Sequence, residues 1–389
     1  MNGGAVDIGS AANNVYSGGL HLELAAKTLY VRVGEIGGLK MGRVKKHHYL
    51  PQFSLRGFAA VDGGRPDHIW RVQKKQEAKH HLVNIADAAA QSDYHTVSDR
   101  AGNRDGALVE QALSPVERAQ SEMLVRVATK QAPAPADVTT FAEFVSLMIC
   151  RVPGYKDFVD ATYRATANLV LDKILQGDNF ERGLAAYGGP KFAQLEPHIK
   201  KAIADRARRI AAGNRLRVDL PNAAVLGGMF GIAGDPRFVN LIQSMGVMLC
   251  EAPASTCFVT GDAPVAFYYP SRLAPGQEGA GIADPRIELT IPLSAHCLAH
   301  LDWASTGWRY ETATMAQVVG FNRRTVVSAL DAIFAPQVSP ELIAVVRENY
   351  HLRAGNQVVE MRDPRTGGRC FLNRAVPVFP ASYYGPAKT

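Results

Sequence analysis

Hydrophobic and polar positions change their spacing several times along the chain. Apolar residues alternate with polar ones over short runs at 68–73 and 94–97, with a further run ending near 83, and this pattern predicts β-strands. From 114 to 250 they recur at three- and four-residue spacing, which predicts helices. Short alternating runs then return before a final helical stretch. The pattern therefore predicts segregated β, α, β and α regions.

Capping and breaking residues indicate where these elements begin and end. Ser114 before Pro115 predicts a helix start, because serine caps the first turn and proline at the first helical position lacks only an N–H that would be unpaired anyway. This helix is expected to reach about 129, where a Pro-Ala segment at 131–136 ends it. Further helices are predicted at 138–151, 155–176, 191–212, 237–250, 312–334 and 339–350, and further strands at 257–262, 287–293 and 296–301.

These elements predict an α+β fold with a predominantly helical body. We expect one small, mainly antiparallel sheet, built from N- and C-terminal segments and wrapped by the helical middle at 114–250. A single domain should span 45–375, with a tail at 376–389. Residues 1–40 are glycine-rich without clear periodicity, which indicates either a flexible extension or upstream sequence before a true start at Met41.

The amino-acid composition is that of a folded protein without membrane spans. Apolar residues make up 47% and charged residues 20% of the 389 residues, as in ordinary folded proteins. The longest apolar runs are too short to span a bilayer, so no membrane partner is expected. The five cysteines contain no C-x-x-C pair, which is typical of buried thiols in a reducing compartment. We therefore expect a cytoplasmic protein.

Positive charge favours a polyanionic partner. The formal net charge is +7, and nucleic acid is the partner it suggests. Basic residues gather at 43–46, at 74–75 and between 200 and 217. The last cluster has helical spacing, so it is either a solvated helix face or a phosphate-binding stripe.

A run from Lys45 to Phe58, KKHHYLPQFSLRGF, resembles the N-terminal signature of the family catalogued as domain of unknown function 4238. Further blocks agree in order and separation: Ile85-Ala86 with Asp93-Tyr94, Cys150 to Pro153, Phe258 to Pro264, Ile291 to Ser294, and Asn322. The resemblance spans about 45 to 335. The chain departs from the family pattern at Val152, Gly261 and Ala263, which puts a role for a hydroxyl at 261 in doubt. The family has no agreed activity, so the resemblance implies kinship of fold and no reaction.

The paired histidines are the residues of this signature best suited to catalysis or metal binding. His47 and His48 can act as base, acid or metal ligand, because imidazole titrates near neutral pH. They weakly resemble the His-His-x-x-Pro start of some His-Me finger nucleases, but the second histidine and asparagine expected downstream are missing. The alternative is structural, with both rings bonded to backbone next to the turn at Pro51.

Each of three later polar residues also has two interpretations. Asp262 follows a predicted strand, so it either projects into a functional loop or caps a turn. Arg151 ends a helix with an apolar face, so it is either an architectural ion-pair partner or a guanidinium for phosphate. Asn322 either bonds a neighbouring loop or points at a ligand.

Convergence of these residues would suit phosphodiester chemistry. We assign catalytic roles to His47, His48, Arg151, Asp262 and Asn322, and substrate binding to Lys45, Lys46, Arg56 and Ser294. His48 and Asp262 are the expected ligands of a divalent cation, Mg²⁺ or Mn²⁺. Ser294 is not expected to be a nucleophile, because no G-x-S-x-G elbow surrounds it.

Two functional hypotheses follow. The first is a metal-assisted nuclease or phosphohydrolase acting on nucleic acid, which predicts a basic pocket. The second is a non-enzymatic module that binds nucleic acid or protein, in which the same polar residues are structural. It predicts that His48 and Asp262 are buried, apart and bonded to backbone.

Overall fold

The computed structural model describes residues 45–61, 65–99, 102–128, 130, 133–175, 194–212, 220–270, 281–352, 355–362 and 369–376. Its largest sheet has five strands in the order β12-β7-β11-β10-β9. These are β7 (Gly246–Glu251), β9 (Ala266–Tyr268), β10 (Glu288–Ser294), β11 (Cys297–Asp302) and β12 (Trp308–Thr312). All neighbours are antiparallel except β12 and β7, which run parallel.

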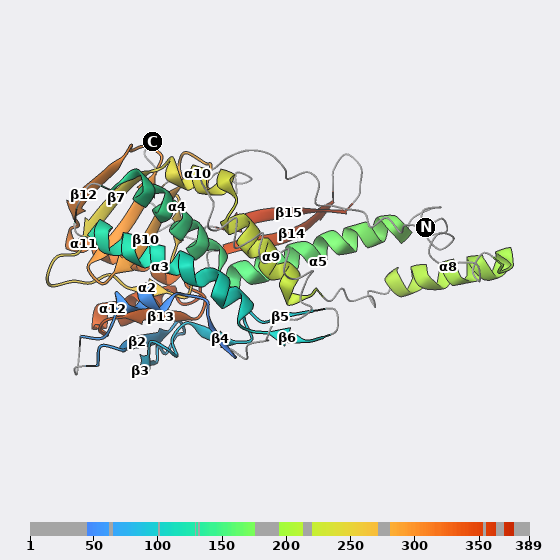
Figure 1. The fold of residues 1–389 in the computed structure, drawn as a ribbon, viewed down its shortest axis with the longest axis horizontal. Coiled ribbons are helices and arrows are strands. Elements are labelled where there is room, and N and C mark those ends of the chain that lie inside the picture. Colours follow the sequence, from blue (N-terminus) through green and yellow to red (C-terminus); the bar gives the residue numbers. More distant parts are fainter. Residues whose placement is uncertain are drawn as a thin grey trace.

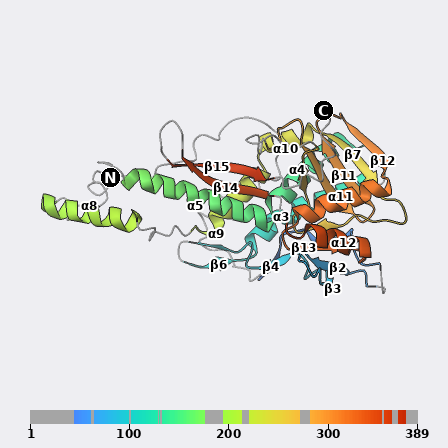
Figure 2. The same ribbon diagram turned by 180° about the vertical axis from the view of Figure 1, so that it is seen from behind.

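Both faces of this sheet are buried. Val247 and Leu249 of β7 face a core that includes helix α4 (Pro135–Cys150), whereas Met248 and Cys250 face a smaller core with Phe321 of α11 (Met315–Ser328). Alternate side chains of a strand point to opposite faces, so a continuous apolar run is the expected sequence of such a strand. Figure 1 shows α4 among the other helices, and Figure 2, from behind, shows α11 over the sheet.

A second sheet has four strands in the order β3-β2-β13-β8. It joins the early strands β2 (His68–Gln73) and β3 (His80–Asn84) to the later β8 (Thr260–Gly261) and β13 (Ala332–Ala335). Helix α12 (Pro340–Asn349) packs against α11 beside it. Three two-stranded sheets complete the described strands, and their members are β1 (Lys46–His48) with β4 (Ala90–Ser92), β5 (Val97–Ser98) with β6 (Arg104–Asp105), and β14 (Gly355–Arg362) with β15 (Arg369–Val376).

Helices form the remainder of the body. Helix α4 is buried along almost its whole length and contacts α3 (Leu108–Ala128), α9 (Asn222–Ala233) and α10 (Pro236–Gln243). Two further helices, α5 (Pro153–Leu175) and α8 (Pro197–Ala212), extend away from the five-stranded sheet, and α5 lies beside β14 (Figures 1 and 2). The short helix α2 (Gln52–Arg56) follows β1 and contacts β10.

The expectation of one small sheet built from the chain ends is wrong. The described residues form five separate sheets, and the largest includes a strand from the region predicted to be entirely helical. The segment at 237–250 was expected to be one helix, but it divides into α10 and β7. A short, continuous apolar run such as that of β7 has the same pattern as a buried helix, so spacing alone does not separate the two.

The predicted start of helix α3 is also wrong. The helix begins at Leu108 rather than near Ser114, and Pro115 lies inside it. The carboxylate of Asp105 accepts hydrogen bonds from the backbone N–H groups of Ala107 and Leu108, which caps the actual start. This earlier start matters because it adds Glu110 to the helix.

The predicted extension at 1–40 and the predicted tail after 376 lie outside the described residues. Among the helices that are described, none combines the length and the apolar character needed to cross a bilayer.

Candidate functional site

The family signature forms one wall of a cleft. Strand β1 pairs with β4, so alternate side chains leave it in opposite directions: His47 is fully buried, and His48 lines the cleft half-buried. Pro51, with φ of −62° and ψ of 139°, precedes α2. A proline disfavours helical backbone at the residue before it, so the helix begins only after Pro51. Gly57 ends α2 where its backbone meets β10, and a Cβ there would lie 2.9 Å from the Leu293 carbonyl oxygen. Glycine therefore lets α2 dock closely on the sheet.

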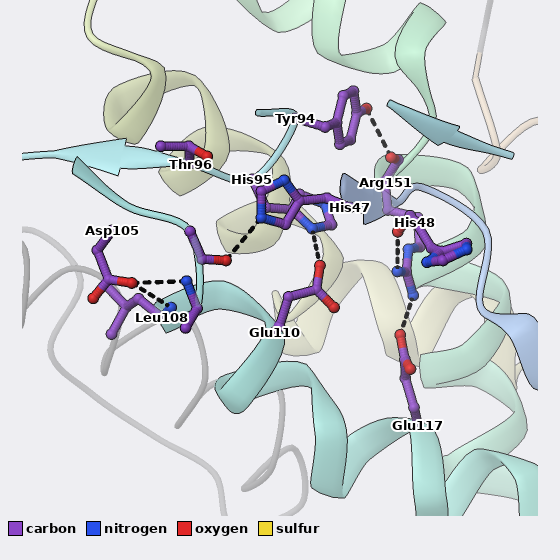
Figure 3. Close-up of polar contacts among 12 residues, drawn as sticks. His47, His48, Tyr94, His95, Thr96, Asp105, Leu108, Glu110, Glu117 and Arg151 are labelled. Carbon is purple, nitrogen blue, oxygen red and sulfur yellow. Dashed lines mark hydrogen bonds and ion pairs between the residues drawn. The ribbon is translucent and has the colours of Figure 1, made fainter. Parts of the chain in front are cut away.

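One face of helix α3 forms the opposite wall. The lining residues on this helix recur at helical spacing and are Glu110, Ser114, Glu117, Arg118 and Ser121. The first wall contributes His48, Pro51, Gln52, Phe53 and Arg56. Together they enclose an open cleft of about 370 Å³. Figure 3 shows Glu110 projecting from α3 toward the adjacent rings of His47 and His95, and Glu117 projecting toward Arg151.

A buried arginine links the two walls. Arg151 is 1% exposed, and its guanidinium donates to Glu117 Oε1 on α3 at 2.8 Å and to the His48 carbonyl oxygen at 2.8 Å (Figure 3). Its own carbonyl accepts a hydrogen bond from the Tyr94 hydroxyl at 2.9 Å. A guanidinium suits this position because it offers several fixed donors. Arg151 therefore fixes β1 relative to α3 from behind the cleft.

Two further imidazoles lie beneath the cleft. His47 Nε2 lies 2.7 Å from the Gly106 carbonyl oxygen, which assigns the proton to Nε2. His95 Nδ1 lies 2.8 Å from Glu110 Oε1, and the ring centroids of His47 and His95 are 5.6 Å apart. Burial lowers the pKa of His95 to about 4, so at neutral pH this ring is uncharged and donates its Nδ1–H to Glu110.

Glu110 remains ionised in this setting. Burial alone would raise the pKa of its carboxyl group, but the hydrogen bond with His95 and the nearby Arg151 charge together lower it. Glu110 thus presents a fixed negative charge on the cleft wall, and His95 holds its orientation from behind.

His48 has the geometry of an oriented base. Its Nε2 lies 3.1 Å from the Ala86 carbonyl oxygen, so Nε2 carries the proton and Nδ1 carries a lone pair. Burial lowers the pKa of His48 below its ordinary value of 6.5, which keeps the ring neutral at neutral pH. Nδ1 has no hydrogen-bond partner within the described part of the chain. A neutral imidazole with one nitrogen held by backbone and the other available is suited to accept a proton.

Positive charge in the cleft comes from Arg56 and Arg118. Both guanidinium groups are exposed, and neither pairs with another described residue. Of the two lining carboxylates, Glu117 is paired with Arg151. Lys45 and Lys46, predicted to bind substrate with Arg56, do not line the cleft, and Lys46 instead pairs with Asp87. The structure therefore places Arg56, and not the lysines, beside His48.

Asp262 lies outside this cleft. Its carboxylate accepts hydrogen bonds from the backbone N–H groups of Leu330, Asp331 and Ala332, at 2.6, 2.8 and 3.0 Å. The residue is 4% exposed and joins β8 to the turn before β13. Burial raises the pKa of this carboxyl group, and the three N–H donors oppose that effect.

Asn322 and Ser294 are also occupied elsewhere. Asn322 accepts from the Val259 N–H at 3.0 Å and donates to the Cys257 carbonyl at 2.9 Å, so it pairs with this segment as a neighbouring strand would. Ser294 Oγ accepts from the His296 N–H at 3.2 Å. The structure therefore brings His47, His48, Arg151 and Arg56 together. Ser294 packs against Gly57 at the end of α2 but does not line the cleft, and Asp262 and Asn322 do not line it either.

The two expected metal ligands, His48 and Asp262, do not lie in the same site. His48 lines the cleft, whereas both carboxylate oxygens of Asp262 are bonded to backbone. A group of three or more His, Cys, Asp or Glu side chains with the geometry to hold a metal ion does not occur within the described ranges.

Sequence reasoning missed the residues of α3. Glu110, Glu117 and Arg118 sit on one face of this helix. Glu110 was left outside the helix because the helix was expected to begin at Ser114, whereas Glu117 and Arg118 lay inside the predicted helix but were not recognised as facing a cleft. The repeated spacing of polar residues from 110 to 121 was the available signal.

The fold and the cleft define a mixed helix and sheet protein whose N-terminal histidine segment is docked against α3 over a polar cleft. A sequence model described as Protein of unknown function (DUF4238) matches residues 46–337, most of the chain, and the chain belongs to this family. The matched range includes His48, α3 and Arg151. Neither the curated proteins nor the solved structures that were searched gave a match.

Replacing Asp262 by alanine should lower stability, because three buried N–H groups lose their acceptor. We expect a loss of about 3 kcal/mol in the free energy of unfolding, measured by urea denaturation. Asp67→Ala, at an exposed aspartate, is the matched control and should change stability by less than about 0.5 kcal/mol. An Asp262→Ala protein as stable as its parent would contradict this structural role.

Proposed function

We propose that this protein is a phosphodiesterase of the nuclease or phosphohydrolase class, acting on nucleic acid in the cleft between α2 and α3. The observation that carries the proposal is His48: a neutral imidazole on the cleft wall, oriented by the Ala86 carbonyl and with an available Nδ1. Arg56 and Arg118 lie on opposite walls of the same cleft and supply unpaired positive charge for a phosphate. The net charge of +7 favours the same partner.

The proposed reaction is hydrolysis. His48 Nδ1 takes a proton from water as the water oxygen bonds to phosphorus, and the bond from phosphorus to the leaving oxygen breaks. The leaving oxygen takes a proton from solvent. The two arginines stabilise the charge that develops on the phosphoryl oxygens.

The proposal includes a divalent cation, but at a different residue from the ligands expected from the sequence. Of the two cleft carboxylates, Glu117 pairs with Arg151, whereas Glu110 pairs with His95 and with no arginine of the described residues, and it is ionised. Mg²⁺ is commonly held by one or two carboxylates together with substrate phosphates. Glu110, and not Asp262, is therefore the residue that would hold Mg²⁺ or Mn²⁺, which would neutralise phosphate charge.

The second candidate is a module that binds without cutting. Asp262 is buried, apart from His48 and bonded to backbone, as that hypothesis expected, whereas His48 is only half-buried. Arg151 and His47 tie the N-terminal segment to the body. In this alternative the cleft binds a polyanion through Arg56 and Arg118 but has no base. A cytoplasmic location is proposed with either function, and the free thiols of Cys150, Cys250, Cys257 and Cys297 are compatible with a reducing compartment.

Cleavage by the parent protein and by His48→Gln tests the proposal. Plasmid DNA, single-stranded DNA, RNA and bis-p-nitrophenyl phosphate would be incubated with each, with and without Mg²⁺ or Mn²⁺. We expect the parent to cut and His48→Gln to be slower by roughly 10²- to 10⁴-fold, because the glutamine cannot accept the proton. His81→Gln, at an exposed histidine of β3, is the matched control and should cut like the parent.

Circular dichroism would establish that both variants are folded. Equal rates for the parent and a folded His48→Gln would remove His48 from the chemistry. A parent that binds these substrates and cuts none would favour the binding module.

The pH profile should report the same residue. A general base must be unprotonated, and the pKa of His48 is lowered from 6.5, so kcat/KM should rise with pH and reach half its plateau below pH 6.5. The chromogenic diester provides the measurement. A midpoint above pH 6.5, or a rate that falls as the solution is made neutral, would contradict the assignment.

A further inference from the structure

The polar cleft is elongated along α3. Its α3 wall runs from Glu110 to Ser121, and a helix rises 1.5 Å per residue, so the wall is about 16 Å long. The α2 wall faces it with Gln52, Phe53 and Arg56. A cleft of about 370 Å³ along this length forms a slot that can hold an extended chain of small groups.

The walls carry an aromatic ring beside the unpaired guanidinium groups. Phe53 is half-buried, lines the cleft, and packs its ring against Phe144 with centroids 6.3 Å apart. The contact with Phe144 holds the Phe53 ring from behind. A base stacks well on such a fixed ring, and base–aromatic stacking accepts any base because every base has a π-face.

Neutral hydrogen-bonding groups complete the lining. Gln52, Ser114 and Ser121 make no side-chain hydrogen bond to any other residue that the structure describes. Amides and hydroxyls of this kind can bond base edges or sugar hydroxyls. The cleft therefore combines positive charge that can bind a phosphate, an aromatic ring that can stack on a base, and neutral groups that can bond the edge of a base.

Phe53 is the group that distinguishes an unpaired base from a paired one. In a duplex each base is stacked on both faces, so Phe53 could not stack on it. In a single strand the bases can splay outward and stack on a side chain.

Resting on the proposed function, we infer that the substrate of this cleft is single-stranded nucleic acid, bound with one unpaired base against Phe53 and its phosphate between Arg56 and Arg118. The inference adds a positioning residue, Phe53, that the proposed reaction does not require. It also assigns the unpaired arginines to a single phosphate.

Fluorescence anisotropy in EDTA tests this inference separately from cleavage. Fluorescein-labelled octathymidylate and octauridylate would be compared with a blunt duplex of the same length at one fixed salt concentration. We expect at least one single strand to bind roughly tenfold or more tightly than the duplex. Phe53→Leu should weaken that binding by roughly 5- to 100-fold, because leucine keeps the packing against Phe144 but cannot stack on a base.

Two further variants separate stacking from folding. Phe238→Leu, at a half-buried phenylalanine of α10 outside the cleft, should bind like the parent. Phe53→Trp keeps a stacking surface and should bind the single strand more tightly than Phe53→Leu does; equal affinity of the two variants would contradict stacking at this position.

The outcomes distinguish this inference from the proposed function. Equal affinity for duplex and single strand, or parental affinity in a folded Phe53→Leu, overturns the inference even if the protein cuts DNA or RNA. Selective single-strand binding that depends on Phe53, in a protein that cuts no substrate, supports the inference and overturns the proposed hydrolysis instead.

Discussion

The buried guanidinium of Arg151 is the interaction on which the site depends. It ends helix α4, yet its donors reach Glu117 on α3 and the carbonyl of His48 on β1. Breaking a buried ion pair by removing one partner commonly costs about 3 to 5 kcal/mol, because the remaining charge is left unpaired in a poor solvent. Here the same group also sets the distance between the walls of the cleft. Architecture and function are therefore not alternatives for Arg151, because its structural bonds position the residues proposed to act.

The chemistry of the cleft follows from two histidines with different surroundings. Neighbouring positions on β1 point to opposite sides, so His47 is buried against Gly106 and His48 reaches the cleft. His95, buried and neutral, orients the ionised carboxylate of Glu110. A neutral base, a fixed negative charge and unpaired arginines thus occupy one cleft, and each is held by backbone, by a buried partner or by its place on a helix face.

Much of the local structure could be predicted from the sequence, and much of the assembly could not. The strand at 68–73 is confirmed, as is the helix that follows Pro153, because alternation and proline signals are local. The division of 237–250 into α10 and β7 was missed, since a buried strand and a buried helix share an apolar pattern.

His48 and Arg56 were found through the signature that carries them. Glu110 was missed because an internal proline, Pro115, resembled a helix start. Arg118 lay inside the predicted helix, but the cleft that it lines forms only where α3 faces α2, and the two helices are distant in sequence. Asp262 and Asn322 have the residue types of a site, but their backbone partners are distant in sequence and no local pattern reveals them.

Hydrogen exchange in an Arg151→Gln variant is the most direct test of the claim that this residue builds the cleft. The account predicts that the segments around 46–53 and 110–121 lose protection together, while β10 and β11 keep theirs. Arg126→Gln, which removes the more exposed ion pair between α3 and Asp137, should leave the 46–53 segment as protected as in the parent. Unchanged protection of both walls in a folded Arg151→Gln protein, or a loss spread evenly over the sheets, would contradict the account.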